Sequence, residues 1–255
     1  MENYSPRDWK IRVVIPALDE ESSIGQVIES LPNSVLGSLK IDSIHVADNG
    51  SKDRTAQIAK EAGARVVTEP RKGYGSACMA AISDLREIAG PPAKEVVVFL
   101  DADLSDDPRC LPQLVEPLIQ QEADLVLGNR AHRGIDRGSL TLQQRFGNAL
   151  ATTLIRWLHG VHYQDLGPFR ACRLETLLEL EMQDPDFGWT VEMQLKAAKI
   201  GLRHLEIDLP YRRRIGHSKI SGTLVGSVKA GIKILSLILF DLKAGSRNRI
   251  DSSAH

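Results

Sequence analysis

Two aspartates, Asp101 and Asp103, directly follow the apolar run Val96–Leu100 in the stretch VVVFLDADLSDDP. The run predicts a buried β-strand, so both carboxylates stand where the chain leaves extended geometry. There they can converge on one hard cation, with phosphate oxygens as further ligands, an arrangement that Mg²⁺ and Mn²⁺ favour. The alternative is a solvated acidic turn in which Asp106 or Asp107 caps the next helix. The buried strand and the polar residues at other strand ends favour the metal site.

Asp48 ends a second apolar segment and precedes an Asn-Gly turn in VADNGSKDRT. Its carboxylate can accept hydrogen bonds from a base or a ribose. The alternative is that Asp48 only forms the turn, with Ser51 or Asp53 as helix caps. The sequence leaves both roles open.

Two basic residues and two glycines precede a predicted helix in EPRKGYGSA, which contains Arg71, Lys72 and Gly73. Basic side chains and backbone amides at a helix start suit a phosphate or a nucleotide base. The stretch is not a Walker loop, because G-x-x-x-x-G-K-[ST] is absent. A plain glycine-rich connection is the alternative.

A basic segment near the C-terminus, YRRRIGHSK, contains Arg212, Arg214 and Lys219. Such a run is usually a solvated face. This one follows a predicted strand and includes Gly216, which also suits a loop that closes on anionic substrates. Arg170 lies in a second short segment, DLGPFRACR, that we expect to be ordered.

Strands and helices alternate along the first half of the chain. The predicted strands are 11–17, 41–48, 64–69, 94–103 and 124–130, and the predicted helices are 19–31, 52–63, 75–90 and 111–123. This α/β alternation predicts a mostly parallel, Rossmann-like sheet flanked by helices on both faces. In such sheets ligands bind beyond the carboxyl ends of the strands, where the polar residues described above are found.

The pattern changes after residue 138. A long helix (139–160), a turn with a short strand (164–173), a helix (189–201) and a strand (202–214) are followed by an amphipathic helix over 223–243 and a polar tail, 246–255. No linker interrupts residues 1–245. We therefore predict one domain, with a nucleotide-binding half (11–130), an acceptor half (131–223) and the C-terminal helix.

The composition excludes several classes of protein. The formal net charge of −1 over 255 residues gives no bulk attraction for nucleic acid. Three separated cysteines suit a reducing compartment, and the N-terminus lacks the apolar core of a signal peptide. No uninterrupted apolar run is long enough to predict a transmembrane helix. We expect a cytoplasmic protein, with residues 225–240 as a candidate peripheral contact at the inner face of the cytoplasmic membrane.

Taken in order, the segments resemble a family 2 glycosyltransferase with the GT-A fold. The later ones are most similar to the dolichyl- or polyprenyl-phosphate sugar transferase branch. The segments that carry the resemblance are VVIPALDEESSIGQVI, VADNGSKDRTAQIA, GYGSA, VVFLDADLSDDP, LVLGNR, QDLGPFRACR, WTVEMQLKA and YRRRIGHSKISGT.

The resemblance implies roles for particular residues. The nucleoside would be held by Pro16, Ala17, Asp19, Glu20 and Asp48. Mg²⁺ or Mn²⁺ on the diphosphate of the sugar nucleotide would be bound by Asp101 and Asp103. Arg170 and the loop around Arg214, Ser218 and Lys219 would meet phosphates. Glu192 occupies the place of an acidic residue near the acceptor, so Asp103, Arg170 and Glu192 are the predicted catalytic residues.

The expected reaction is an inverting, metal-dependent transfer of a hexose from a UDP- or GDP-sugar. A phosphorylated or lipid-linked acceptor such as polyprenyl phosphate is favoured, because the basic loop suits an anion. Three alternatives stay open: a soluble or hydroxyl acceptor with Glu192 as base, a sugar-phosphate nucleotidyltransferase, and a non-catalytic scaffold at a membrane surface. The sequence also leaves open a homo-oligomer.

Overall fold

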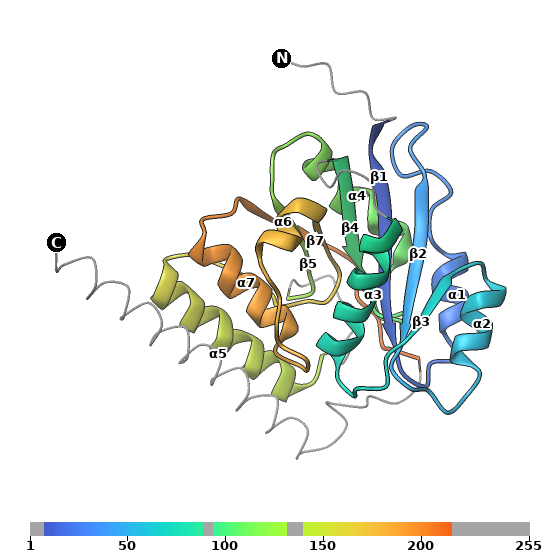
Figure 1. Ribbon diagram of the computed structural model, residues 1–255. Coiled ribbons are helices and arrows are strands. Elements are labelled where there is room, and N and C mark those ends of the chain that lie inside the picture. The colour runs from blue at the N-terminus through green and yellow to red at the C-terminus, as the bar shows by residue number, and fades with distance from the viewer. Residues whose placement is uncertain (1–7, 89–93, 132–139, 216–255) are drawn as a thin grey trace.

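The computed structural model describes residues 8–88, 94–131 and 140–215, and its seven strands form one sheet (Figure 1). Ser218, Lys219, the predicted helix 223–243 with its candidate membrane contact 225–240, and the tail 246–255 lie outside the described residues. The predicted division into a nucleotide-binding and an acceptor half stays a prediction.

The sheet is mostly parallel, as the sequence predicts. Its strand order is β3-β2-β1-β4-β6-β5-β7, and β6 runs antiparallel to both of its neighbours. The strands are β1 Lys10–Ala17, β2 Ile41–Asp48, β3 Arg65–Thr68, β4 Glu95–Phe99, β5 Leu125–Asn129, β6 Arg170–Arg173 and β7 His204–Asp208. The carboxyl ends of β1, β2 and β4 therefore lie at one edge of the sheet, which brings distant polar segments together.

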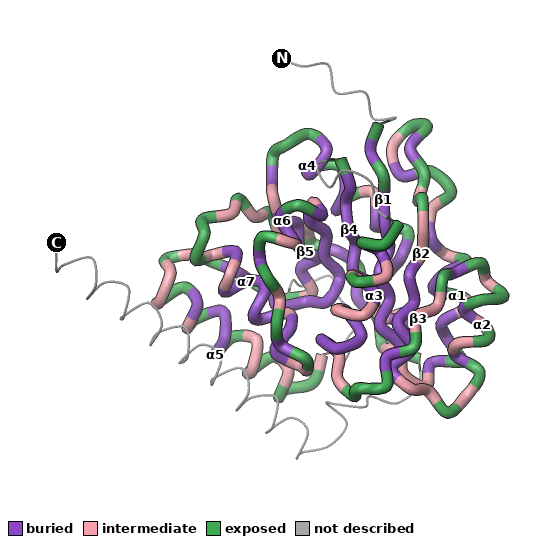
Figure 2. The backbone as a smooth tube through the Cα atoms, in the orientation of Figure 1, coloured by how far each residue is buried: buried purple, intermediate pink, exposed green. Residues whose placement is uncertain are grey.

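Helices cover both faces of the sheet because successive side chains of a strand point to opposite sides. In β1, Val13 and Ile15 join one core cluster, and Val14 joins the other. The first cluster includes side chains of α1 Ile24–Glu29, α2 Thr55–Glu61 and α4 Leu111–Ile119. The second includes side chains of α3 Tyr74–Ile88, α5 Leu142–His159, α6 Leu174–Glu179 and α7 Trp189–Lys199. Figure 2 shows the buried strands between these two layers.

The first predicted helix is shorter than its sequence suggests. The carbonyl of Glu20 accepts bonds from the backbone of Ser23 and Ile24, and α1 begins only at Ile24. The predicted range 19–31 would place Asp19 and Glu20 in the first turn of the helix, whereas in the structure they lie before it. This leaves Asp19 and Glu20 in the loop after β1, next to the sheet edge.

Asp124 joins three strands at the opposite side of the molecule from β3. Its carboxylate accepts bonds from the guanidinium groups of Arg203, at 2.8 and 3.0 Å, and Arg173, at 2.6 Å. The hydrogen bonds with Arg203 are the main reason that the pKa of Asp124 falls to about 2. Asp124 thus connects the start of β5 to the end of β6 and the start of β7.

We expect Asp124→Asn to lower the free energy of unfolding by about 1–2 kcal/mol at pH 7, a figure reduced for partial exposure to solvent. Because folding lowers the pKa of Asp124, its stabilisation is complete above the unfolded value near 4 and is lost as the pH falls towards 2. Urea denaturation between pH 7 and pH 3 should show the two proteins converging. Glu175→Gln, which removes an exposed partner of Arg173, is the matched control. A difference that stays constant with pH would contradict this role.

Candidate active site

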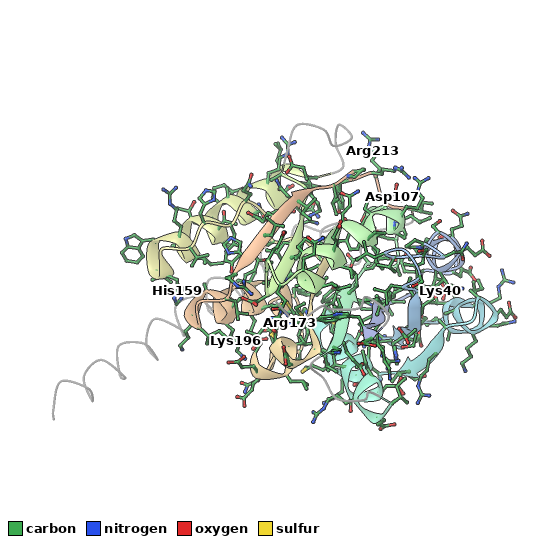
Figure 3. The ribbon with its side chains drawn as sticks, turned by 90° about the horizontal axis from the view of Figure 1, so that it is seen from above. Lys40, Asp107, His159, Arg173, Lys196 and Arg213 are labelled. Carbon is green, nitrogen blue, oxygen red and sulfur yellow. The ribbon has the colours of Figure 1, made fainter. Side chains whose placement is uncertain are left out.

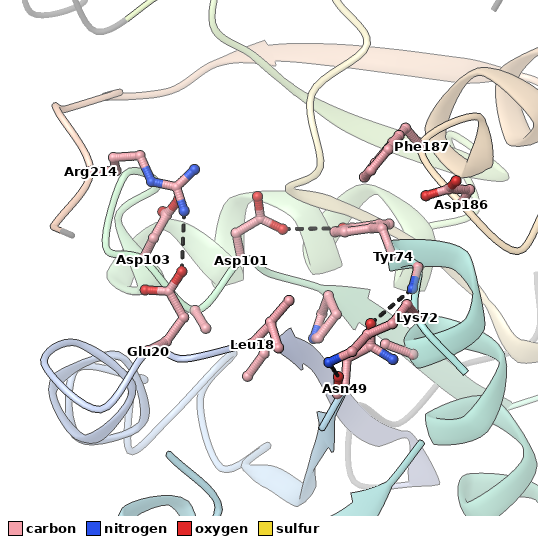
Figure 4. Close-up of a pocket in the computed structure, with 15 residues that line it drawn as sticks. Leu18, Glu20, Asn49, Lys72, Tyr74, Asp101, Asp103, Asp186, Phe187 and Arg214 are labelled. Carbon is pink, nitrogen blue, oxygen red and sulfur yellow. Dashed lines mark hydrogen bonds and ion pairs between the residues drawn. The ribbon is translucent and has the colours of Figure 1, made fainter. Parts of the chain in front are cut away.

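A pocket of about 350 Å³ opens at the carboxyl ends of β1, β2 and β4 (Figure 4). It is lined by residues at the ends of these strands and in the loops after them, in the loop between β3 and α3, at the start of α3, in the loop before α7 and in the segment after β7. They are Pro16, Ala17, Leu18, Glu20, Asn49, Lys72, Gly73, Tyr74, Ala77, Asp101, Ala102, Asp103, Asp186, Phe187 and Arg214. The sequence analysis named eight of these positions as site residues.

Asp101 and Asp103 lie together in this pocket. Asp103 is buried, and one carboxylate oxygen accepts the backbone N–H of Ser105 at 2.9 Å. Asp101 accepts the hydroxyl of Tyr74 at 3.1 Å. Burial, followed by the charge of Asp103, raises the pKa of Asp101 to about 7. Burial and a neighbouring carboxylate both disfavour the ionised form of Asp101, so positive charge in this pocket would stabilise it.

Arg214 supplies positive charge from the segment after β7. Its guanidinium lies 3.1 Å from Glu20 and 3.1 Å from Asp103, between the loops after β1 and β4 (Figure 4). The backbone of Ile215 donates to the carbonyl of Asp103 at 2.9 Å, and that of Arg212 donates to Ser105. These bonds hold the basic segment over the paired carboxylates.

The donor set fits a divalent cation shared with a ligand. Within the described parts of the chain, no group of three or more His, Cys, Asp or Glu side chains forms a complete metal cage. Asp103 already pairs with a guanidinium, and Asp101 lines the same pocket. Two such carboxylates suit Mg²⁺ or Mn²⁺ when phosphate oxygens and water complete the shell.

Arg212 points elsewhere. Its guanidinium pairs with Asp107 at 3.0 Å, and Asp107 also binds Arg109. The predicted contact of Arg212 with phosphate is therefore not the arrangement in the structure, in which Arg214 is the arginine of this run that lines the pocket.

Asn49 organises the side of the pocket formed by the loops after β2 and β3. Its side-chain amide donates to the carbonyls of Glu69 and Arg71, at 3.0 and 2.7 Å, and its side-chain oxygen accepts the N–H of Gly73 at 2.9 Å. The ammonium of Lys72 contacts the backbone carbonyl of Asn49 at 2.9 Å. The sequence analysis missed Asn49, although its place in DNG beside Asp48 was a usable signal.

Three predicted nucleotide-binding residues do not line the pocket in this structure. Asp48 is buried and accepts the N–H of Ser51 at 3.2 Å, which is the turn-forming alternative. Asp19 accepts the N–H of Lys52 at 2.7 Å. Arg71 pairs with Glu69 at 2.9 Å. All three stabilise the loops that carry the pocket residues, and their predicted contacts with the nucleotide stay predictions.

Arg170 is buried in the core and not exposed to a ligand. Its guanidinium donates to the carbonyls of Leu166, Gly167 and Thr190. Burial lowers the pKa of Arg170, and carbonyl oxygens take the place of water. This arrangement differs from the predicted contact with phosphate: Arg170 ties β6 to the start of α7.

Glu192 also has a different setting from the predicted acceptor site. Its carboxylate accepts the backbone N–H groups of Gln183 and Asp184, the latter at 2.7 Å, and pairs with Lys196 at 2.8 Å. The side chain is buried, and Glu192 is absent from the pocket lining. It fixes the loop that carries Asp186 and Phe187 into the pocket.

That loop packs directly on the start of α3. A Cβ atom at Gly73 would overlap the carbonyl oxygen of Pro185, and one at Gly75 would overlap that of Asp184. The N–H groups of Gly75 and Ser76 donate to carbonyls of this loop. The GYG sequence is therefore needed for close packing of backbone on backbone. Asp186 and Phe187 were missed because this contact joins segments far apart in the sequence.

Comparison with known proteins identifies the fold and the family. Residues 12–180 match the model of glycosyl transferase family 2. An uncharacterized glycosyltransferase of Mycobacterium tuberculosis is 37% identical over 221 residues, which cover 86% of this chain and 94% of the relative. The dolichyl-phosphate hexose transferase of Haloferax volcanii is 31% identical over 231 residues, 90% of this chain and 94% of the relative.

Solved structures agree. Glucosyl-3-phosphoglycerate synthase from Mycobacterium tuberculosis, in complex with phosphoglyceric acid, superposes with a TM-score of 0.70 and 26% identity, covering 91% of this chain and 80% of that chain. A complex of the same enzyme with Mn²⁺, UDP-glucose and glycerol 3-phosphate gives a TM-score of 0.68 and 25% identity, covering 91% and 80%. These likenesses confirm the GT-A architecture.

We expect Gly75→Ala to lower the free energy of unfolding by about 1–3 kcal/mol, because the added methyl group must displace a backbone carbonyl. Thermal or urea denaturation measures this change. Gly147→Ala is the matched control: Gly147 lies inside α5, and a Cβ atom there would have nothing within 4 Å, so the protein should gain up to about 1 kcal/mol. Equal stability of the two variants would contradict the close packing of this loop.

Proposed function

Because the chain belongs to glycosyl transferase family 2, we propose that it transfers a hexose from a UDP- or GDP-sugar to the phosphate of a polyprenyl phosphate. The observation that carries the proposal is the pair of carboxylates, Asp101 and Asp103, beside Arg214 in a pocket at the carboxyl ends of the strands. This arrangement supports a ligand that carries both a metal ion and negative charge.

The donor would lie along the edge of the sheet. Pro16 and Ala17 at the end of β1, and Glu20 in the loop after it, would be available to the nucleoside. Asp101 and Asp103 would hold Mg²⁺ or Mn²⁺, which stabilises the charge that develops on the departing diphosphate. Arg214 and Lys72 add positive charge to the same pocket. With Asp103 holding the metal, Arg214 would be available to a phosphate oxygen of the donor.

The two kinds of acceptor differ in whether the reaction needs a base to remove a proton. A phosphate monoester is an anionic nucleophile at neutral pH, so it needs positioning more than it needs a base. Glu192, the predicted base for a hydroxyl acceptor, has its carboxylate bound to backbone N–H groups and to Lys196. Relatives named dolichyl-phosphate hexose transferase and undecaprenyl-phosphate mannosyltransferase support a phosphorylated lipid acceptor.

The test is transfer of radiolabelled sugar from UDP-glucose and from GDP-mannose, with Mn²⁺, to polyprenyl phosphate. We expect a lipid-linked product from one donor and none when the free polyprenol replaces the phosphate. Asp103→Asn should lower kcat by at least about 100-fold, because the metal loses a charged ligand. Glu116→Gln, an exposed change on α4, should leave the rate unchanged.

Glu192→Gln distinguishes the two kinds of acceptor. With a phosphate acceptor we expect the variant to keep at least about a tenth of the activity, since it loses no proton acceptor for the reaction. Transfer to polyprenol or phosphoglycerate but not to polyprenyl phosphate, together with a loss of about 100-fold or more in Glu192→Gln, would contradict the proposed acceptor.

A further inference from the structure

One face of α5 presents large apolar side chains to the outside. Leu142, Phe146 and Trp157 are 81%, 72% and 76% exposed, and Leu150 is 36% exposed. In the described part of the chain, eight large hydrophobic residues are exposed, and these four are on the one helix. Isolated exposed apolar residues are ordinary, whereas a contiguous set of this kind marks a surface that binds something.

The four residues form a single stripe along the helix. At 100° per residue they fall within an arc of about 100°, together with Ala149 and Thr153. The opposite face of α5 supplies the buried side chains Ala151, Thr152 and Ile155. The helix therefore has two apolar faces, one packed on the core and one turned outward. Figure 1 shows α5 at the periphery of the molecule, outside α7.

The charges on α5 are all of one sign. Its sequence, LQQRFGNALATTLIRWLH, has no acidic residue. Arg145 and Arg156 are both exposed and lie along the same edge of the stripe, one near each end. Figure 3 shows His159 where α5 ends. Aromatic and aliphatic side chains with a basic edge are typical of a helix that lies in the interface of an anionic membrane.

We propose that the outward face of α5, defined by Leu142, Phe146, Leu150 and Trp157 with Arg145 and Arg156 at its edge, binds the surface of an anionic lipid bilayer. The helix would lie parallel to the membrane, with its apolar stripe among the acyl chains and its arginines at the lipid phosphates. Among the described residues, no helix is long and apolar enough to span a bilayer.

The basic charge of α5 argues against two other partners for this face: a second copy of the chain and the C-terminal residues 223–243. An antiparallel pair of α5 helices, related by a twofold axis, would bring the two arginine edges together. The C-terminal residues 223–243 carry Lys229, Lys233 and Lys243 against one acidic residue, Asp241, so they too match an anionic surface better than a basic edge. An anionic bilayer complements both segments.

The test uses the full-length protein and vesicles of phosphatidylcholine alone or with one quarter phosphatidylglycerol. Trp157 gives a direct readout, because the other two tryptophans, Trp9 and Trp189, are buried. We expect binding to the anionic vesicles in a sedimentation assay and a blue shift of the emission of Trp157. Phe146→Glu combined with Leu150→Glu should lower the partition coefficient at least tenfold and abolish the shift.

Two further variants make the result specific. Arg145→Gln with Arg156→Gln should weaken binding to the anionic vesicles severalfold without weakening any residual binding to phosphatidylcholine. Ile200→Glu with Leu205→Glu changes two other exposed apolar residues, 47% and 39% exposed, and should bind vesicles as the unaltered protein does. Nucleotide binding measured on Phe146→Glu with Leu150→Glu should be unchanged, which separates this surface from the proposed transfer reaction.

Three outcomes would overturn the proposal. In the first, the unaltered protein fails to sediment with anionic vesicles, or the Phe146→Glu and Leu150→Glu variant sediments equally well. In the second, this variant converts a dimer to a monomer in ultracentrifugation while neither protein binds vesicles, which assigns the face to a second copy. In the third, the variant lowers the melting temperature by several degrees while neither protein binds vesicles, which assigns the face to a segment of the same chain.

Discussion

Two carboxylates, Asp101 and Asp103, share one pocket, and this is the constraint on which the rest of the site depends. Both lie just after β4, which is buried along its whole length, and Asp103 is itself buried. Burial, and after it the charge of Asp103, raises the pKa of Asp101 to about 7. Nearby positive charge stabilises the ionised form of such a pair, and the surrounding elements supply it.

Arg214 brings positive charge to these carboxylates from a distant part of the sheet. The segment after β7 crosses back to the loop after β4, where Arg212 and Ile215 donate backbone hydrogen bonds and Arg214 bridges Glu20 and Asp103. In the proposed function, a metal ion at Asp103 would take the place of this guanidinium, and Arg214 would be available to a phosphate oxygen of the donor.

Much of the fold could be predicted from the sequence, because buried parallel strands are short runs of β-branched residues with clear ends. Strand 41–48 has the predicted limits, and each other predicted strand contains an observed one or overlaps most of it. The shared position of Asp101 and Asp103 in the pocket was predicted for the same reason, because a single strand places both, and their role as metal ligands stays a prediction. The short helix α6 gave no comparable signal, and the sequence analysis missed it.

The rest of the site depends on contacts between segments far apart in the sequence. Nothing local distinguishes Arg214, which lines the pocket, from Arg212, which pairs with Asp107. Arg170 and Glu192 are ionisable residues in plausible segments, yet their partners are backbone groups of other loops. Asp186 and Phe187 reach the pocket only because Gly73 and Gly75 allow two backbones to touch.

The most direct test of the central claim is calorimetric titration of the protein with UDP and with GDP, each with and without Mn²⁺. If the paired carboxylates hold a metal ion for a diphosphate, one nucleotide will bind at least about tenfold more tightly with Mn²⁺, and Asp103→Ala will lose this gain. Nucleotide binding that is indifferent to Mn²⁺, or a metal effect that survives in Asp103→Ala, would contradict the account.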